Sequence, residues 1–188
     1  FNAAEESMSP VILLSDGYIS HLYETIIPHR DFTIKTRSRP PLGTGNRHFT
    51  GLSHDDSMPQ TSDVDNYRRL ITHFREKQQL TAQRYNSYEY LECSKETDTL
   101  LISYGALSRI AYYFKNDFAL YRPIRMFPIV EEIKIIASRY KRILIVEMNM
   151  GQYAREIERI LHREVEFIPI LGGRIDLKEI KQKIYGQK

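Results

Sequence analysis

The pattern of hydrophobic and polar positions becomes regular after Asp98. Four short apolar runs predict buried strands, at residues 100–103, 119–124, 143–146 and 165–168. Apolar residues that recur every three or four positions predict the helices between them, at residues 107–115, 130–140, 152–162 and from Asp176 onward. Strands that alternate with helices are typical of βαβ units. We therefore expect an α/β fold, a parallel sheet with helices on both faces.

The first part of the chain is less regular. The apolar run Val11–Leu14 predicts a strand buried on both faces, and Asp16 and Gly17 close it. A short helix is expected over residues 19–27. This stretch is too small to fold alone, so we expect it to be the end of an incomplete domain.

Residues 28–61 are rich in proline and glycine and have no apolar period, which predicts a long ordered loop or linker. Ser62 is then expected to cap an amphipathic helix that runs to about Gln83. A short extended segment follows at residues 88–91. The chain is thus expected to have three parts, which are residues 1–27, 28–61 and 62–188.

The composition is that of an ordinary globular protein, with 41% hydrophobic and 27% charged residues among 188. No apolar run approaches the roughly 20 residues that span a bilayer. The net charge of +3 is mild, and Lys and Arg do not gather with aromatic residues. Neither a membrane nor nucleic acid is therefore expected as a partner. The chain does not begin with Met, and we expect it to be a piece of a longer protein.

Cys93 is the only cysteine of the sequence. A chain with one cysteine has no internal disulfide, which fits a reducing compartment such as the cytoplasm. It also cannot hold a four-cysteine zinc or iron–sulfur site by itself. We therefore expect this chain alone to bind no cofactor of that kind.

Four residues of the loop have side chains that commonly bind metals. They are His48, His54, Asp55 and Asp56, and their spacing matches neither a helical pair nor a known zinc motif. Hydrogen bonding within the loop is the simpler interpretation. A loop of this composition also suits a substrate mouth or a subunit contact. We therefore assign no metal ligand here.

Two polar turns follow predicted strands, at the sheet edge where open parallel sheets bind ligands and partners. In the first turn, Tyr104 and Gly105 precede a helix. The first amides of that helix, together with Arg109, are able to hold an anion. A tight helix start with an exposed arginine is the simpler alternative.

In the second turn, Glu147 ends a strand and Asn149, Gly151 and Gln152 follow it. General acid–base catalysis normally needs a titrating partner within hydrogen-bond reach, and the two amides do not titrate. We therefore assign no catalytic residue, and interpret the turn as an element that anchors a loop or contacts another subunit. Either role requires donors or a cation beside Glu147, such as Arg47 or a side chain of a partner.

Three stretches resemble the alpha subunit of 2-oxoacid:ferredoxin oxidoreductases, most closely the 2-oxoglutarate type. They are PVILLSDGYISHLYET at 10–25, FTGLSHDDSMPQTSD at 49–63, and the pair LLISYGALSR and RILIVEMNMGQYAREIER at 100–109 and 142–159. They occur in the order and spacing of the family, and the resemblance covers nearly the whole chain. It implies the last strand of a pyrimidine-binding domain, followed by a domain like the transketolase C-terminal domain.

The resemblance also implies an activity for the complete enzyme. Family members use thiamine diphosphate, Mg²⁺ and iron–sulfur clusters to decarboxylate a 2-oxoacid oxidatively, form an acyl-CoA from coenzyme A and pass electrons to ferredoxin. The segments that hold the substrate and the aminopyrimidine would lie upstream of Phe1. The diphosphate, Mg²⁺ and cluster ligands would lie on a partner, the beta subunit. Ala106 departs from the family, whose members often carry Ser there. This chain alone is then expected to be inactive, and to act in structure and subunit assembly.

Two other interpretations remain open. One is a stand-alone α/β module that binds a small anionic ligand at the same sheet edge. The other is the C-terminal domain of a transketolase or of a pyruvate dehydrogenase beta subunit. The candidate residues for a subunit interface or a ligand-binding edge are Asp16, Gly17, His54, Asp55, Asp56, Tyr104, Gly105, Arg109, Glu147, Asn149, Gly151 and Gln152.

Overall fold

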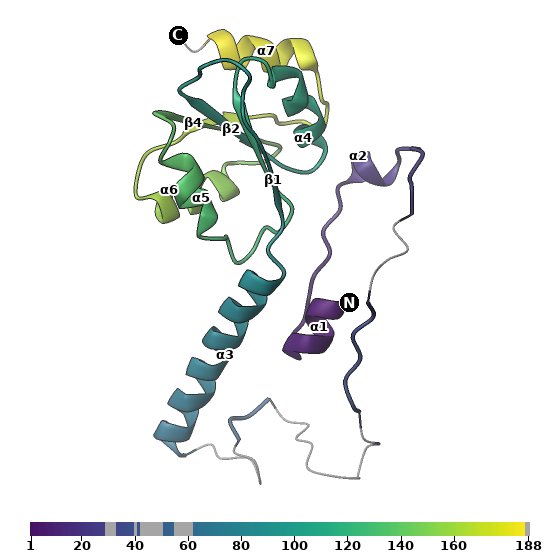
Figure 1. Ribbon diagram of the computed structural model, residues 1–188, viewed down its shortest axis with the longest axis vertical. Helices are drawn as coiled ribbons and strands as arrows, with labels where there is room; N and C mark the ends of the chain where they lie inside the picture. The colour runs from purple at the N-terminus through teal and green to yellow at the C-terminus, as the bar shows by residue number, and fades with distance from the viewer. Residues whose placement is uncertain (29–32, 40, 42–50, 55–61, 187–188) are drawn as a thin grey trace. The chain divides into compact units, whose positions relative to one another are not determined.

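The computed structural model of the protein describes residues 1–28, 33–39, 41, 51–54 and 62–186 (Figure 1). By their contacts the residues form two compact units, and each is described by itself. The first unit is Phe1–Leu13 with Ile26–Asn86, and the second is Leu14–Thr25 with Ser87–Lys188. The three-part division made from the sequence remains a prediction, and these contacts group the long helix before residue 85 with the first unit.

The second unit contains a five-stranded sheet in the order β1-β3-β2-β4-β5. The strands are β1 (Tyr88–Leu91), β2 (Thr99–Ser103), β3 (Ala119–Pro123), β4 (Arg142–Glu147) and β5 (Glu166–Pro169). The last four strands are parallel, as predicted. Strand β1 pairs antiparallel with β3 at one edge of the sheet. The local pattern at β1 predicted an extended segment and did not predict its direction.

Helices cover both faces of this sheet, which confirms the predicted α/β fold (Figure 1). They are α4 (Ala106–Ala111) with the 3-10 helix η1 (Tyr112–Phe114), α5 (Glu132–Ala137), α6 (Gln152–Leu161) and α7 (Leu177–Gly186). Helices α5 and α6 pack on one face, and α4 and α7 pack on the other.

Alternation of side chains along the buried strands builds the two cores. Leu100 and Ile102 of β2 pack in one cluster with Ile157 of α6. Leu101, between them, packs in the other cluster with Ile180 of α7. All five side chains are at most 1% exposed. Strands buried on both faces are therefore apolar at every position, which is why the sequence shows continuous apolar runs.

Two predictions for the first 27 residues are wrong. Val11–Leu14 is not a strand, and its side chains are 53% to 94% exposed. A strand buried on both faces needs hydrogen-bonded neighbours and covering side chains, and the described residues supply neither. The helix expected over 19–27 is limited to α2 (Gly17–Ser20). Thr25 and the isoleucines after it are β-branched residues, which lose side-chain freedom in a helix.

The first unit contains α1 (Asn2–Ser7) and the long helix α3 (Val64–Arg84). Helix α3 begins one residue later than predicted, because Asp63 is its cap and accepts a hydrogen bond from the Asn66 amide at 2.8 Å. Within the described ranges, no helix is both long enough and apolar enough to cross a bilayer.

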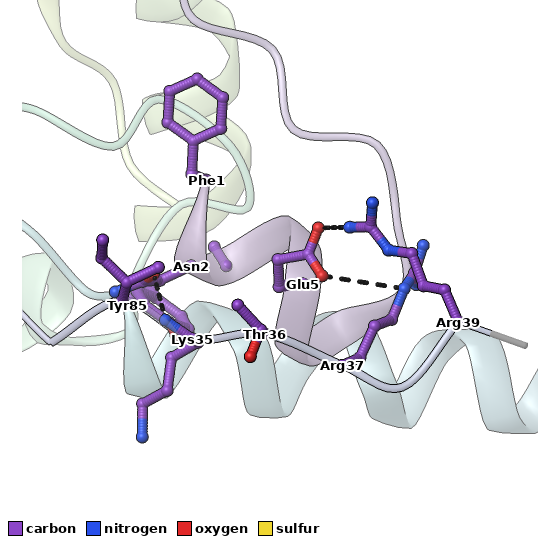
Figure 2. A pocket seen from close by; sticks show the side chains of 10 residues that line it. Phe1, Asn2, Glu5, Lys35, Thr36, Arg37, Arg39 and Tyr85 are labelled. Atoms are coloured by element: carbon purple, nitrogen blue, oxygen red, sulfur yellow. Dashed lines mark hydrogen bonds and ion pairs between the residues drawn. The ribbon is translucent and has the colours of Figure 1, made fainter.

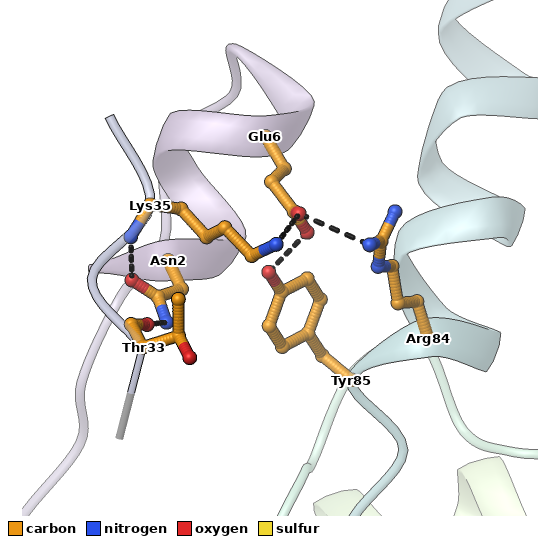
Figure 3. A network of polar contacts seen from close by, with 6 residues as sticks. All are labelled: Asn2, Glu6, Thr33, Lys35, Arg84 and Tyr85. Carbon is orange, nitrogen blue, oxygen red and sulfur yellow. Dashed lines mark hydrogen bonds and ion pairs between the residues drawn. The ribbon is translucent and has the colours of Figure 1, made fainter. Parts of the chain in front are cut away.

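Glu6 of α1 joins three parts of the first unit (Figure 3). Its carboxylate accepts a hydrogen bond from the Tyr85 hydroxyl and pairs with Arg84 at 3.2 Å and with Lys35 at 3.7 Å. These contacts lower the pKa of Glu6, the hydrogen bond from Tyr85 being the largest cause. A single carboxylate thus connects α1, the end of α3 and the segment around residue 35.

Candidate functional site

The carboxyl ends of β2 and β4 bring the two polar turns of the sequence together. The register pairs Ser103 with Val146, so Tyr104 and Glu147 follow as neighbours at the same edge. The Tyr104 hydroxyl donates a hydrogen bond to Glu147 Oε2 at 2.7 Å. Parallel pairing of β2 and β4 therefore brings together two residues that are 43 positions apart in the sequence.

Glu147 is buried, with 1% of its surface exposed. Besides the Tyr104 hydroxyl, its carboxylate accepts hydrogen bonds from the amides of Tyr153 at 3.2 Å and Ala154 at 3.0 Å. These amides belong to the first turn of α6, which has no carbonyl partner for them. A buried carboxylate needs such donors, and the positive end of the helix dipole favours it further. Glu147 therefore holds the start of α6 against the end of β4.

Asn149 closes the turn between β4 and α6. Its Oδ1 accepts hydrogen bonds from the amides of Gly151 at 2.8 Å and Gln152 at 3.3 Å, and its Nδ2 donates to the Tyr104 hydroxyl at 2.8 Å. Gly151 has φ +88°, and a Cβ there would lie 3.2 Å from the Phe167 ring. Glycine is required at this position because both the backbone conformation and the close approach disfavour a side chain.

Tyr104 is the hub of this cluster, since its hydroxyl donates to Glu147 and accepts from Asn149. Burial, and then the hydrogen bond to Glu147, raise the pKa of the Tyr104 phenol above its ordinary value. Its ring meets the Tyr153 ring edge-to-face at 5.3 Å between centroids. The phenol therefore stays neutral at physiological pH and acts as a fixed hydrogen-bonding group.

The start of α4 is occupied by a carboxylate of the chain itself. Asp16 Oδ2 accepts a hydrogen bond from the Ala106 amide at 2.8 Å, and Asp16 Oδ1 accepts one from the Ile19 amide at 2.7 Å. Arg109, expected to add positive charge for an external anion, is exposed and pairs with Glu24. The hydrogen bond that Arg109 donates to Glu24 lowers the pKa of the Glu24 carboxyl. The place predicted for a bound anion is thus filled by Asp16.

The same arrangement recurs at the start of α7, the helix that follows β5. Asp176 Oδ1 accepts a hydrogen bond from the Lys178 amide at 2.8 Å, at the start of α7. Asp16, Glu147 and Asp176 therefore cap α4, α6 and α7, respectively. Glu147, the most buried of the three, accepts three hydrogen bonds, which suits an anchoring carboxylate better than a general base.

Relatives of the chain are named for a subunit of one enzyme. The 2-oxoglutarate synthase subunit KorA of Methanothermobacter marburgensis is 31% identical over 223 aligned positions, which cover all of this chain and 59% of the relative. The chain is similar over its whole length to the KorA subunit of 2-oxoglutarate synthase. The KorA subunits of Methanothermobacter thermautotrophicus and Methanocaldococcus jannaschii are 31% and 25% identical, over 95% and 99% of this chain. The predicted resemblance is therefore confirmed.

The chain spans less than two thirds of the length of the KorA relatives, 56% to 59% of each. No protein-family model matches it. Among solved structures, it is similar to a 2-oxoglutarate:ferredoxin oxidoreductase from Magnetococcus marinus, solved with 2-oxoglutarate, coenzyme A and succinyl-CoA bound. The TM-score is 0.69 at 17% sequence identity, over 81% of this chain and 28% of that chain. At this identity the likeness supports the fold alone.

The other candidate residues of the sequence are Gly17, His54, Asp55 and Asp56. Gly17 is the first residue of α2, directly after its cap Asp16. His54 belongs to the first unit, where its Nδ1 lies 3.2 Å from the Leu52 carbonyl oxygen. Asp55 and Asp56 lie outside the described residues, as do His48 and Arg47. Among the described residues, no group of three or more His, Cys, Asp or Glu has the geometry of a metal site.

Glu24 is a site residue that sequence reasoning missed. It lies in a segment with no clear period, and only its charge, opposite to that of Arg109, hinted at the pair. Tyr153 was predicted as part of a helix face, but its amide bond to Glu147 depends on where α6 begins. Such partners are set by the packing of elements rather than by local sequence.

The first unit contains a cavity of about 800 Å³, which sequence reasoning also missed (Figure 2). Charged residues on its wall come from α1 and the segment after residue 33. Glu5 pairs with Arg37 at 3.8 Å and with Arg39, and Tyr85 lies at the other end of the wall. The charged side chains of the wall thus serve to hold residues 33–39 against α1.

Proposed function

We propose that this chain is a portion of the alpha subunit of a thiamine-diphosphate-dependent 2-oxoacid:ferredoxin oxidoreductase. The complete enzyme would decarboxylate a 2-oxoacid such as 2-oxoglutarate oxidatively, form the acyl-CoA from coenzyme A and pass the electrons to ferredoxin. The observation that carries this proposal is the 31% identity to a KorA subunit over all of this chain. The parallel sheet with helices on both faces supports it.

Within that enzyme, we assign this portion a role in structure and assembly. One cysteine cannot supply the ligands of a four-cysteine iron–sulfur cluster. Three of the four helices that follow the parallel strands, α4, α6 and α7, already hold Asp16, Glu147 and Asp176 at their starts, and these carboxylates would repel a diphosphate. The described residues therefore do not fit either group. The beta subunit is proposed to hold them, and a cytoplasmic location, expected from the single cysteine, belongs to the same proposal.

The filled helix starts also bear on the alternative of a free module that binds a small anion. Such a module needs backbone amides that point at its ligand. Here the amides of Ala106, Tyr153 and Ala154 donate to carboxylates of the chain itself. The sheet edge therefore favours an anchoring role over the binding of an external anion.

The proposal is tested by co-expressing the natural-length protein with its candidate beta subunit. The purified complex is expected to reduce ferredoxin only when a 2-oxoacid and coenzyme A are both present. The 188-residue chain alone, supplied with thiamine diphosphate and Mg²⁺, is expected to give no turnover above background. Turnover by the chain alone would overturn the assembly role. A complex that forms but reduces no ferredoxin with any 2-oxoacid would overturn the enzyme assignment.

A further inference from the structure

Helix α3 carries a row of exposed apolar side chains. Val64, Tyr67, Ile71 and Phe74 are spaced three or four residues apart, so they share one face of the helix. They are 61%, 54%, 47% and 45% exposed, respectively. We call these four residues the α3 stripe. Single exposed apolar residues are ordinary, but four on adjacent turns of one face form a contiguous surface.

The stripe continues a helix face that is already a packing surface. Toward the end of α3, the same face carries Ala82, which is 8% exposed, and leads to Tyr85, whose hydroxyl bonds to Glu6 of α1. At Met8, α1 ends, and its carbonyl oxygen lies 3.5 Å from Lys77 Nζ. Helix α1 therefore covers only the last turns of this face. Toward the N-terminus of α3, the stripe extends the same surface by about three turns.

Cations border the stripe on both sides. Arg68 and Arg75 lie three and four positions from Ile71, which places them along one border, where Arg68 also pairs with Asp65 at 3.0 Å. Along the other border, Lys77 Nζ lies 5.4 Å from the centre of the Phe74 ring. The opposite face of α3 has mixed charge, with Asp65, Arg69, Thr72 and Glu76. Positive charge is thus concentrated beside the apolar surface.

We propose that the α3 stripe docks onto the partner subunit of the enzyme, at an apolar surface edged by carboxylates. This inference rests on the proposed function, and it names the contact through which the two subunits would meet. The stripe supplies large side chains for a desolvated centre, and Tyr67 and Phe74 are of the aromatic type that interface centres favour. Arg68, Arg75 and Lys77 supply the charge that carboxylates on the partner would match.

A second copy of this chain fits the surface poorly. When two identical helices pack antiparallel through the stripe, the border with Arg68 and Arg75 faces itself. When they pack parallel, that border faces the border with Lys77. Both arrangements place cations against cations, which disfavours association. A membrane surface also fits poorly, because Asp65 and Glu76 put negative charge on the face that would lie among the headgroups.

Photocrosslinking in the natural-length protein, co-expressed with its beta subunit, tests the contact. With p-benzoylphenylalanine in place of Phe74, irradiation is expected to join this chain to the beta subunit. Mass spectrometry should place the crosslink in a peptide where apolar residues adjoin Asp or Glu. The control carries the same group in place of Thr72 on the opposite face, and no crosslink is expected. Crosslinks from position 74 only to a second copy or to the chain itself would overturn the inference, as would a complex that forms without any crosslink.

Charge reversal at the border gives an independent measurement. The double variant Arg68→Glu, Arg75→Glu is expected to bind the beta subunit about tenfold more weakly, whereas Arg69→Glu on the opposite face should change the affinity less than about twofold. Circular dichroism checks that α3 stays helical in both. Equal affinities for the two variants would overturn the proposal, as would binding of wild-type protein to phosphatidylglycerol vesicles in place of the beta subunit. If wild-type protein forms no complex at all, the proposed function fails first.

Discussion

The carboxylate of Asp16 accepts a hydrogen bond from the amide of Ala106, 90 positions further along the chain, at 2.8 Å. Gly105, just before that amide, has φ +58° and leaves room for the acid. A Cβ at position 105 would lie 2.8 Å from Asp16 Oδ2. The two positions are therefore matched, because the acid at 16 needs a residue without a side chain at 105.

Replacing Asp16 should loosen two helix starts at once. Asp16→Ala removes the acceptor for the Ile19 and Ala106 amides, and losing a cap of this kind costs about 1–2 kcal/mol. Urea unfolding measures the loss, and hydrogen exchange at these two amides should become faster. Asp16→Asn keeps a single acceptor oxygen, so it should retain only one of the two hydrogen bonds and lose less stability than Asp16→Ala. Unchanged exchange at Ala106 in the alanine variant would contradict the assigned bond.

The match between positions 16 and 105 predicts non-additive effects. Gly105→Ala should destabilise the protein by at least about 1 kcal/mol, because alanine is strained at positive φ and its Cβ would meet the carboxylate. Combined with Asp16→Ala, the steric part of this cost should disappear. The free energy lost in the double variant should therefore be smaller than the sum of the two single losses. Strict additivity would show that the two residues do not meet in solution.

Glu147 is expected to affect stability more than any exposed carboxylate of α6. Glu147→Gln puts an amide group against one of three donors, which leaves a buried donor unpaired at a cost of about 1–3 kcal/mol. The matched control is Glu156→Gln, which breaks an exposed ion pair with Arg159 worth at most about 1 kcal/mol. Thermal unfolding of the two variants measures the difference.

Tyr104→Phe completes this comparison, because it removes the hydroxyl between Glu147 and Asn149. The double variant Tyr104→Phe, Glu147→Gln should lose less free energy of unfolding than the sum of the two single variants, because both changes break the same hydrogen-bond network. If the internal donors hold Glu147 as described, Glu147→Gln should lower stability even in the absence of a partner subunit. A loss of subunit association with unchanged unfolding would instead place Glu147 at an interface.

Alkaline pH should destabilise the fold through its tyrosines. Burial, and then a hydrogen bond to Asp117, raise the pKa of Tyr185 to about 12, and burial also raises the pKa of Tyr104 and of Tyr153. When the folded pKa lies above the unfolded one, the unfolded chain ionises first. The stability is then fully present below the ordinary tyrosine pKa of 10 and falls as the pH rises above it. Thermal unfolding in steps up to about pH 11 measures the fall. In the variant Tyr185→Phe, stability should fall less steeply as the pH rises. The same dependence of stability on pH in this variant and in the wild-type protein would contradict the raised pKa of Tyr185.

Local patterns in the sequence were sufficient for most of the second unit. The runs at 100–103 and 143–146 predicted β2 and β4 within one residue at each end, because buried parallel strands are apolar at every position. Helix α6 was predicted within one residue, since its apolar residues recur at helical spacing. The same reasoning failed at Val11–Leu14, where an apolar run stays exposed. An apolar run predicts a strand only when neighbouring strands are present to pair with it.

The sequence by itself determined that the turn after β4 is polar, that it holds glycine and that a helix follows it. It also placed Glu147 next to the amide side chains of Asn149 and Gln152, which do not titrate, and this made anchoring a better interpretation than catalysis. Only the tertiary structure decided what is anchored. The pairing of Ser103 with Val146 brings Tyr104 beside Glu147, and the return of the chain near residue 16 puts a carboxylate at the start of α4. These contacts join residues that are 43 and 90 positions apart in the sequence. Strand register and packing determine which distant residues meet, and no local sequence pattern encodes either.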